Sequence, residues 1–242
     1  MMSVGIQVGV TPAASCQYLP DQQEQLAVVM SADYHTPEKY AALLAAGFRR
    51  SGNLIYRPHC PQCQACQAIR IDVNQYQPSK SQKRHRSQLN RLEVKVSDQL
   101  DANWFALFQR YIAARHADGN MYPAKRQAFL DFIGSDWLSP RFIHLYQRDH
   151  HQLTLVAIAV TDVVDDGLSA LYTFFEPEHR FSLGRVSIQA QLQLANSLEL
   201  PWLYLGYQID ACSAMRYKAD YYPHQRFINQ QWRAFTWPVI PQ

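Results

Sequence analysis

The sequence predicts an α+β fold: an antiparallel sheet with flanking helices in a C-terminal lobe, preceded by a smaller lobe that contains most of the cysteines. Two observations lead to this class. In the second half of the chain, three segments rich in β-forming residues follow one another and are separated by short polar turns. An apolar stripe at helical spacing then runs along residues 182–200, and another strand pattern follows it.

The first half of the chain is expected to form short elements on both sides of a cysteine loop. A helix is predicted after Thr36, because Thr36 can cap it, Pro37 suits its first position and Gly47 can close it. A second helix is predicted to begin with Asp101 as its cap and to end at Gly119. Short strands are expected over residues 48–58 and 67–73.

The second half is predicted to be a meander followed by a helix and a returning strand. Strands are expected over residues 142–147, 153–163 and 168–175, and the middle one is apolar on both faces, as in a buried central strand. The strand over 201–209 follows the helix, and this order describes an α+β sandwich of the acyltransferase type. We expect the lobes to divide near residue 100, into residues 1–100 and 101–242.

Composition excludes several classes of protein. The net charge is only +3, so the totals do not predict a large basic surface. No window reaches about 18 uninterrupted apolar residues, as a membrane span requires. The start of the chain, MMSVGIQVGVTP, lacks the basic and apolar regions of a signal peptide. We therefore predict a cytoplasmic location and no membrane partner, and in that reducing compartment clustered cysteines indicate metal binding or free thiols rather than disulfides.

Three cysteines have the spacing of a metal site. Cys60, Cys63 and Cys66 follow the pattern C-x2-C-x2-C, which brings three sulfurs close enough to share one ion or cluster. A closed structural zinc site needs a fourth ligand, for which Cys16 and His59 are the candidates. The spacing is also similar to an iron–sulfur run, although no Cys-Pro follows at the required distance. The alternative interpretation is a set of free thiols packed under a turn.

A basic stripe follows the cysteine loop. Between Asp72 and Glu93 the chain contains five Lys or Arg residues and no acid. Such a stripe can follow the phosphates of a nucleic acid even when the whole protein is nearly neutral, and the alternative is a solvated helix face. No Walker loop, nucleophile elbow or H-E-x-x-H pair is present in the sequence.

Several longer blocks, taken in chain order, resemble the aminoacyl-tRNA–protein transferase family. In the first half they are GFRRSGNLIYRP, the cysteine loop followed by IRIDV, and PSKSQKR. In the second half they are RHADGNM, LSALYTFFEP, SLG, YLGYQIDAC and MRYKADYYP. The similarity extends from about Cys16 to Phe235, and the compact chain with its CPxCxxC loop resembles the bacterial branch.

This resemblance implies an acetyltransferase-like (GNAT-type) fold and a specific activity. The activity is transfer of leucine from Leu-tRNA to proteins with N-terminal Asp or Glu, which marks them for downstream proteolytic machinery. No cofactor is expected to be required for the chemistry, because the ester is already activated by the tRNA. A structural zinc or iron–sulfur cluster is the group that the cysteines suggest, with Cys16, Cys60, Cys63 and Cys66 as its ligands.

The same resemblance, with the chemistry of ester aminolysis, indicates three sets of site residues. The catalytic candidates, which would orient the amine and transfer protons, are Tyr172, Glu176, Tyr207 and Lys218. An acceptor carboxylate needs a cationic fork, for which the candidates are Arg49, Arg57, Arg70 and Arg84. The residues expected to bind tRNA are Lys80, Lys83, Arg86 and Arg91.

Three alternatives remain at this point. An arginyl-tRNA–protein transferase of the same family would share these blocks. A non-catalytic, metal-dependent RNA-binding module would explain the basic stripe and the cysteines, but not the blocks of the second half. A small-molecule N-acetyltransferase would need a Q/R-x-x-G-x-G/A loop before its main helix, which RFSLGR does not supply.

Overall fold

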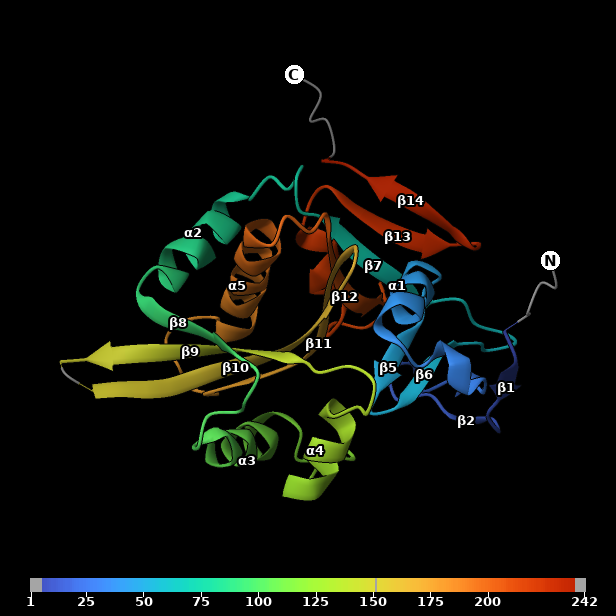
Figure 1. The fold of residues 1–242 in the computed structure, drawn as a ribbon, viewed down its shortest axis with the longest axis horizontal. Coiled ribbons are helices and arrows are strands. Elements are labelled where there is room, and N and C mark those ends of the chain that lie inside the picture. Colours follow the sequence, from blue (N-terminus) through green and yellow to red (C-terminus); the bar gives the residue numbers. More distant parts are fainter. Residues whose placement is uncertain (1–5, 151, 238–242) are drawn as a thin grey trace.

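The computed structural model describes residues 6–150 and 152–237 of the chain. Within these residues the strands form an eight-stranded sheet, a four-stranded sheet and a two-stranded ribbon, and helices pack on both faces of the largest sheet (Figure 1). The predicted α+β class is confirmed. Residues 1–5, part of the segment that carries the expectation about a signal peptide, lie outside the described residues.

The eight-stranded sheet has the order β14-β13-β7-β12-β11-β10-β9-β8. Every neighbouring pair is antiparallel except β11 and β12, which are parallel and are joined through helix α5. The predicted meander, helix and returning strand are therefore all present. The strands are β7 (Gln67–Asp72), β8 (Leu92–Ser97), β9 (Arg141–Asp149), β10 (Gln152–Val164), β11 (Gly167–Phe175), β12 (Trp202–Gln208), β13 (His224–Ile228) and β14 (Gln231–Phe235).

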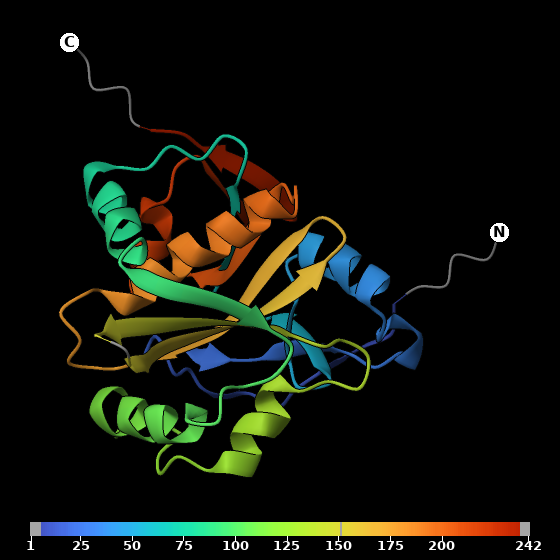
Figure 2. The same cartoon turned by 60° about the vertical axis from the view of Figure 1, so that its left-hand side comes forward.

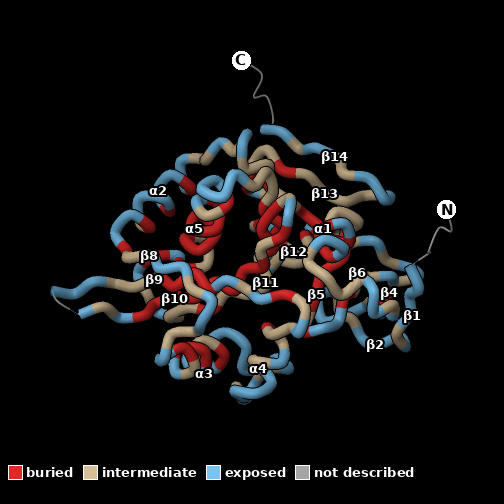
Figure 3. The backbone as a smooth tube through the Cα atoms, in the orientation of Figure 1, coloured by how far each residue is buried: buried red, intermediate tan, exposed pale blue. Residues whose placement is uncertain are grey.

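Helices cover the two faces of this sheet (Figure 2). On one face lie α2 (Lys80–Leu89) and α5 (Leu183–Ser197), and on the other α3 (Trp104–Arg115) and α4 (Arg126–Ile133). Alternate residues of β10 serve the two cores: Ala157 and Ala159 pack under α5, whereas Ile158 and Val160 pack against α3 and α4. This strand is buried along most of its length, as its apolar composition predicts (Figure 3).

The N-terminal part of the chain forms a second, smaller sheet of order β1-β4-β6-β5. Helix α1 packs beside this sheet, and the core between them continues onto Tyr204 of β12. The first hundred residues also contribute β7 and β8 to the central sheet, so that sheet draws strands from both sides of residue 100. The elements of this part are β1 (Val8–Val10), β2 (Ala14–Ser15), β3 (Gln23–Glu24), β4 (Leu26–Val29), η1 (Ala32–Tyr34), α1 (Pro37–Ala45), β5 (Arg49–Ser51) and β6 (Leu54–Pro58).

The predicted helix signals differ in how well they mark the ends. The hydroxyl of Thr36 accepts a hydrogen bond from the backbone N–H of Lys39, which caps α1 as expected. The prediction for α3 is wrong at both ends, since Asn103 occupies the N-cap position and the helix ends at Arg115. Asp101 instead accepts hydrogen bonds from the Asn103 backbone N–H and the Tyr146 hydroxyl, which fixes the turn before the helix.

The parallel strands β11 and β12 pair over only three residues and then separate. Each strand has a register shift just beyond the last pair, at Leu171 in β11 and at Leu205 in β12. The guanidinium of Arg49, on β5, donates hydrogen bonds to the carbonyl of Ala170 on β11 and to that of Tyr204 on β12. These bonds satisfy backbone carbonyls at the point where the two strands part.

The adjacent Arg50 joins the two sheets from the other side of β5. Its guanidinium forms a bidentate ion pair with Asp162 of β10, at 2.6 and 2.9 Å, and both side chains are fully buried. Its remaining N–H groups donate to the backbone carbonyls of Ile133, Gly52 and Gly134. The pair is therefore fully hydrogen-bonded on the arginine side.

None of the helices in the described residues combines the length and the apolar composition that a membrane span requires. The longest of them, α5, has 15 residues.

Replacing Arg50 with Met should destabilise the protein by about 3–5 kcal/mol, because the substitution leaves the buried carboxylate of Asp162 unpaired. Chemical denaturation monitored by circular dichroism measures this change. The double variant Arg50→Met/Asp162→Leu should lose less than the sum of the two single variants, since it removes both charges. Additive losses would contradict the pairing.

Candidate active site

A cleft of ≈ 1690 Å³ opens where β11 and β12 separate. The two strands supply one wall through Ala170–Thr173 and Leu205, and α5 supplies another through Gly184, Ile188 and Gln191. The cysteine loop, the β13–β14 turn and the loop around η2 (Arg216–Asp220) also line it, together with parts of the N-terminal strands and of α3. The cleft is thus built from both halves of the chain.

The structure brings three of the four predicted catalytic residues to this cleft. Tyr172, Tyr207 and Lys218 line it, from β11, β12 and η2 respectively. Glu176 lies just after β11, outside the cleft lining, and its carboxylate is paired with Arg110 at 2.8 Å. The geometry therefore groups the two tyrosines with the lysine and separates the glutamate from them.

Lys218 is a buried amine that lines the cleft and has no carboxylate partner among the described residues. Its ammonium donates to the backbone carbonyl of Tyr207 at 2.7 Å and contacts the sulfur of Met215 at 3.2 Å. Burial, together with the positive charge of Arg49, lowers the pKa of Lys218 to about 7. The amine is therefore able to exchange a proton near neutral pH.

The two tyrosines differ in how their hydroxyl groups are used. The Tyr207 hydroxyl donates to the backbone carbonyl of Gly47 at 3.1 Å, which ties β12 to the end of α1. Tyr172 has no hydrogen-bond partner in the described part of the chain, and its ring packs edge-on against Phe129 and Phe132. Burial raises the pKa of both phenols, so both carry their protons at neutral pH.

Of the four arginines predicted to bind an acceptor carboxylate, Arg57 is the one that lines the cleft. Its guanidinium stacks over the ring of Phe48 and makes a long hydrogen bond to the backbone of Ala46. No carboxylate among the described residues pairs with it. The other charged residues of the lining, apart from histidines, are Lys218 and Glu24.

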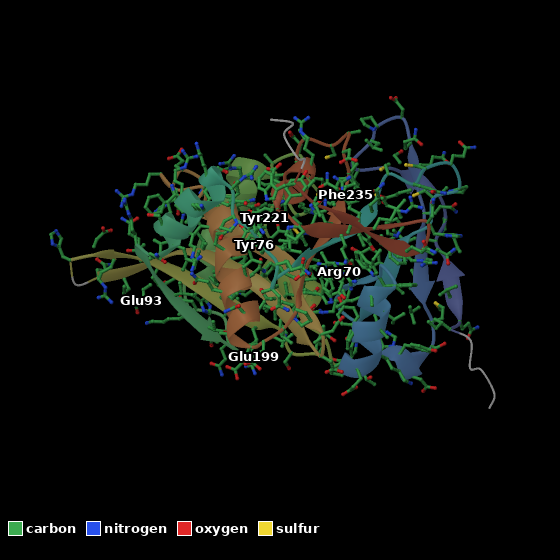
Figure 4. All side chains as sticks on the ribbon, turned by 90° about the horizontal axis from the view of Figure 1, so that it is seen from above. Arg70, Tyr76, Glu93, Glu199, Tyr221 and Phe235 are labelled. Atoms are coloured by element: carbon green, nitrogen blue, oxygen red, sulfur yellow. The ribbon has the colours of Figure 1, made fainter. Side chains whose placement is uncertain are left out.

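The other three arginines are engaged or lie elsewhere. Arg49 is buried between β11 and β12, where it binds backbone carbonyls. Arg70 lies between the rings of Trp202 and Trp232, at 3.7 and 4.2 Å from their centres. Arg70 lies in β7, between β12 and β13 in the sheet, and Figure 4 shows it away from the labelled pair Tyr76 and Tyr221.

The guanidinium of Arg70 is also hydrogen-bonded through both ends, to Gln225 at 2.7 and 3.0 Å and to the Tyr204 hydroxyl at 3.1 Å. Arg84 lies on the exposed face of α2, outside the cleft lining. The structure thus separates the predicted cationic fork and leaves Arg57 as the member that faces the cleft.

Helix α2 carries the predicted tRNA-binding residues on its exposed side. Ser79 and Gln82 form a capping box at its start, and Gln82, His85 and Leu89 face inward. Lys80, Lys83 and Arg86 are exposed along the helix, and Arg91 is exposed just beyond its end. The stripe is therefore a surface that presents positive charge, and no acidic residue of α2 interrupts it.

The cysteine loop lies at one end of the cleft, which Cys16, Cys60, Cys63 and Cys66 all line. All four thiols are free, and the pKa of Cys66 is raised to about 12 by burial and by the neighbouring Cys60, Cys16 and Cys63. Across residues 6–150 and 152–237, no group of three or more His, Cys, Asp or Glu side chains is arranged to hold a metal ion. As placed, the cysteines are neighbours but do not form a closed ligand set.

Sequence reasoning missed three features of the cleft. Gln191 of α5 and Glu24 of β3 both line it, and neither belongs to a recognisable motif. The bulge at Leu171 is the third, since it leaves this residue without a partner on β10 or β12. A buried glutamine on the cleft side of an amphipathic helix is the only sequence signal that these features offer.

The chain is similar to proteins of one family over most of its length. A family model described as "Arginine-tRNA-protein transferase, N terminus" matches residues 14–84, and one described as "Arginine-tRNA-protein transferase, C terminus" matches residues 103–228. Aspartate/glutamate leucyltransferase from Vibrio vulnificus (strain CMCP6) is 47% identical over 228 residues, which cover 94% of this chain and 97% of the relative. The protein of the same name from Aeromonas salmonicida (strain A449) is 44% identical over 229 residues, with 94% of each chain covered.

Two solved structures are weakly similar to the chain. L-PGS from Bacillus licheniformis superposes with a TM-score of 0.46 at 9% identity, over 61% of this chain and 48% of its own. FemX superposes with a TM-score of 0.45 at 9% identity, over 84% of this chain and 79% of its own.

The lowered pKa of Lys218 should appear in the pH dependence of stability. Between about pH 7 and 10 the unfolded lysine binds a proton that the folded lysine has released, so the free energy of unfolding should rise with pH. Relative to a Lys218→Met variant, the wild type should gain about 2 kcal/mol between pH 7 and 9. Urea denaturation across this range measures the difference. A Lys80→Met variant on the exposed helix α2 is the matched control, and its free energy of unfolding should follow that of the wild type across this pH range. If the curve of Lys218→Met also ran parallel to that of the wild type, the lowered pKa of Lys218 would be contradicted.

Proposed function

The chain belongs to the arginine-tRNA-protein transferase family, and we propose that it transfers leucine from Leu-tRNA to the α-amino group of proteins that begin with Asp or Glu. The observation that carries this proposal is the 47% identity, over 94% of the chain, to an aspartate/glutamate leucyltransferase. A product that begins with leucine is then marked for degradation. The cleft between β11 and β12 supports this activity as the place where both substrates meet.

The reaction is aminolysis of an ester, and the cleft residues suit its proton transfers. The attacking amine must lose a proton and the leaving ribose oxygen must gain one. Lys218, with a pKa near 7, is suited to accept the first proton, because a large fraction of it is neutral at physiological pH. Tyr172, which is protonated and has no partner within the described residues, is suited to donate the second. Tyr207 positions Lys218 through its backbone carbonyl.

The developing oxyanion needs hydrogen-bond donors. We assign the backbone N–H at the Leu171 bulge as one such donor, because Leu171 has no register partner on β10 and lies beyond the last pair with β12. A backbone N–H held on a strand is a rigid donor that costs little reorganisation during the reaction. The rest of the rate enhancement comes from orienting the amine and the ester, since neither step requires a redox centre or a metal ion.

We assign to Arg57 the binding of the acceptor's side-chain carboxylate. This guanidinium lines the cleft without a carboxylate partner in the described residues, and a planar fork suits bidentate binding. Glu24 is the acid of the same lining, which suits the positive α-ammonium of an incoming N-terminus. Together they match the two opposite charges that an N-terminal Asp or Glu presents.

The remaining assignments extend this proposal beyond the cleft. The exposed face of α2 is suited to the phosphates of the tRNA, through Lys80, Lys83, Arg86 and Arg91. The cysteine loop is a structural part of the cleft wall and takes no part in the chemistry. We propose that the two lobes divide near residue 100, which lies between the two family-model matches. We also propose that the protein acts in the cytoplasm, where charged tRNA is available.

Transfer of arginine is the second candidate, because the descriptions of both matching family models name an arginine-tRNA-protein transferase. Purified protein should transfer leucine from Leu-tRNA to peptides that begin with Asp or Glu, and it should do so poorly with Arg-tRNA or with peptides that begin with Asn or Ala. Radiolabelled aminoacyl-tRNA and peptides that differ only at the first residue provide the assay. Preference for Arg-tRNA would establish the second candidate, and equal transfer to all peptides would contradict the acceptor specificity.

Replacing Arg57 with Ala should raise the acceptor KM by about tenfold to a hundredfold, because a charge-assisted hydrogen bond contributes about 1.5–3 kcal/mol. The KM for Leu-tRNA should change little. The double variant Lys83→Gln/Arg86→Gln is the contrasting control. It should weaken the binding of Leu-tRNA, and the slope of log K against log salt concentration should become shallower by about one unit per lost phosphate contact. Steady-state kinetics across a salt series measures both. An unchanged acceptor KM in Arg57→Ala would remove this arginine from the acceptor site.

A further inference from the structure

Gln191 is a polar side chain that is completely buried and yet lines the cleft. It lies in the middle of α5, its exposed fraction is 0%, and its neighbours in the lining are Ile188 on the same helix and the strands β11 and β12. Its side-chain nitrogen Nε2 donates a hydrogen bond to the hydroxyl oxygen of Thr161 at 2.9 Å. The side chain therefore spans from the helix to the sheet at the floor of the cleft.

The surrounding hydrogen bonds determine which way the amide points. The Thr161 hydroxyl contacts the backbone carbonyl of Ala159 at 3.4 Å, to which it can only donate its proton. Its oxygen is then left to accept from Gln191, which requires that Nε2 of the amide faces Thr161. The carbonyl oxygen Oε1 consequently points elsewhere, and it is buried without a hydrogen-bond partner among the described residues.

This unpaired oxygen distinguishes Gln191 from other buried polar groups. Several buried side chains in the described residues lack a partner, including Gln208 and Ser187, but of that group only Gln191 lines the cleft. A buried acceptor without a partner is unfavourable, because it has lost water and gained nothing in exchange. A ligand that enters the cleft with a donor group would restore the missing bond.

The position of Gln191 indicates which donor group this is. Thr161, which orients the amide, lies in β10 at the register shift opposite Leu171, the bulge assigned to the ester oxygen. In an aminoacyl ester, the α-amino group is attached to the carbon next to the ester carbonyl. A carbonyl bound at the bulge therefore places that amino group in the same part of the cleft.

We propose that Oε1 of Gln191 accepts a hydrogen bond from the α-amino group of the leucyl moiety on the tRNA, and so positions the donor ester. This inference rests on the proposed leucine transfer and adds a positioning residue to it. This hydrogen bond orients the ester carbonyl of the leucyl group toward the acceptor amine, and it keeps the leucyl α-amino group away from the acceptor. An amide suits this role better than a carboxylate, because a carboxylate with no bound donor would be a buried, unpaired charge.

Donor analogues on the same tRNA test the proposal directly. The tRNA is acylated chemically with leucine, with 2-hydroxy-4-methylpentanoate, which keeps a hydrogen-bond donor, or with 4-methylpentanoate, which has none. For the wild type, kcat/KM for transfer to one Asp-initiated peptide should fall about tenfold to a hundredfold from leucine to 4-methylpentanoate, with the hydroxy analogue in between. In Gln191→Met the three values should converge to within about threefold.

Gln189→Met is the matched control for this experiment. Gln189 lies on the same helix, is also buried, and donates to the Tyr76 hydroxyl at 3.0 Å, but it does not line the cleft. Figure 4 shows Tyr76 next to Tyr221, and the two rings stack at 6.1 Å. This variant should keep the wild-type preference for leucine. If Gln191→Met does not fold, the three-donor comparison in the wild type still tests the proposal, because a wild type without a preference for leucine overturns it.

The outcomes distinguish a failure of the proposed role of Gln191 from a failure of the proposed leucine transfer. A wild type that transfers leucine but treats all three donors alike overturns the role of Gln191 and leaves the proposed function intact. An undiminished preference in Gln191→Met also overturns that role, as does an equal loss in Gln189→Met. A wild type that transfers none of the three donors overturns the proposed function and this inference with it.

Discussion

The cleft depends on one buried cation, Arg49, at the point where β11 and β12 part. Two parallel neighbours in a sheet normally satisfy each other's backbone groups, and separating them leaves carbonyls that need donors. Arg49 reaches both strands from the N-terminal sheet and donates to the carbonyls of Ala170 and Tyr204. The opening between the strands is therefore stabilised by a side chain from outside the central sheet, and the N-terminal residues are part of the site rather than an appendage to it.

The same interaction sets the electrostatics of the cleft. The positive charge of Arg49 disfavours a second cation nearby, and together with burial it lowers the pKa of Lys218. Gly206 lies beside both side chains: its φ of +87° favours glycine, and an added Cβ would be in ordinary contact with the Lys218 nitrogen at 3.7 Å and the Arg49 guanidinium at 3.8 Å. Structural support and the proposed proton transfer are thus connected through the electrostatic effect of Arg49 on Lys218.

Adjacent arginines on β5 perform two different tasks because successive side chains of a strand point to opposite faces. Arg49 enters the gap between β11 and β12, whereas Arg50 pairs with Asp162 on β10 and binds the loop after α4. The GFRRSG block therefore contributes to structure, and the proposed carboxylate-binding role is left to Arg57 on the next strand. In the proposed reaction, this division leaves few charged residues in the cleft to receive the two substrates.

The sequence by itself determined the local elements and the family. The helix cap at Thr36, the apolar run of β10 and the meander order follow from propensity and periodicity, which act over a few residues. Contacts between distant residues decided the rest: the stacking that engages Arg70, the pairing of Glu176 with Arg110, and the unpaired oxygen of Gln191. Arg57 and Arg70 look alike in sequence, since each lies in a short strand beside the cysteine loop. Their burial and partners differ because burial and hydrogen-bond satisfaction depend on which strands and helices meet in space, and the spacing of residues along the chain does not specify that.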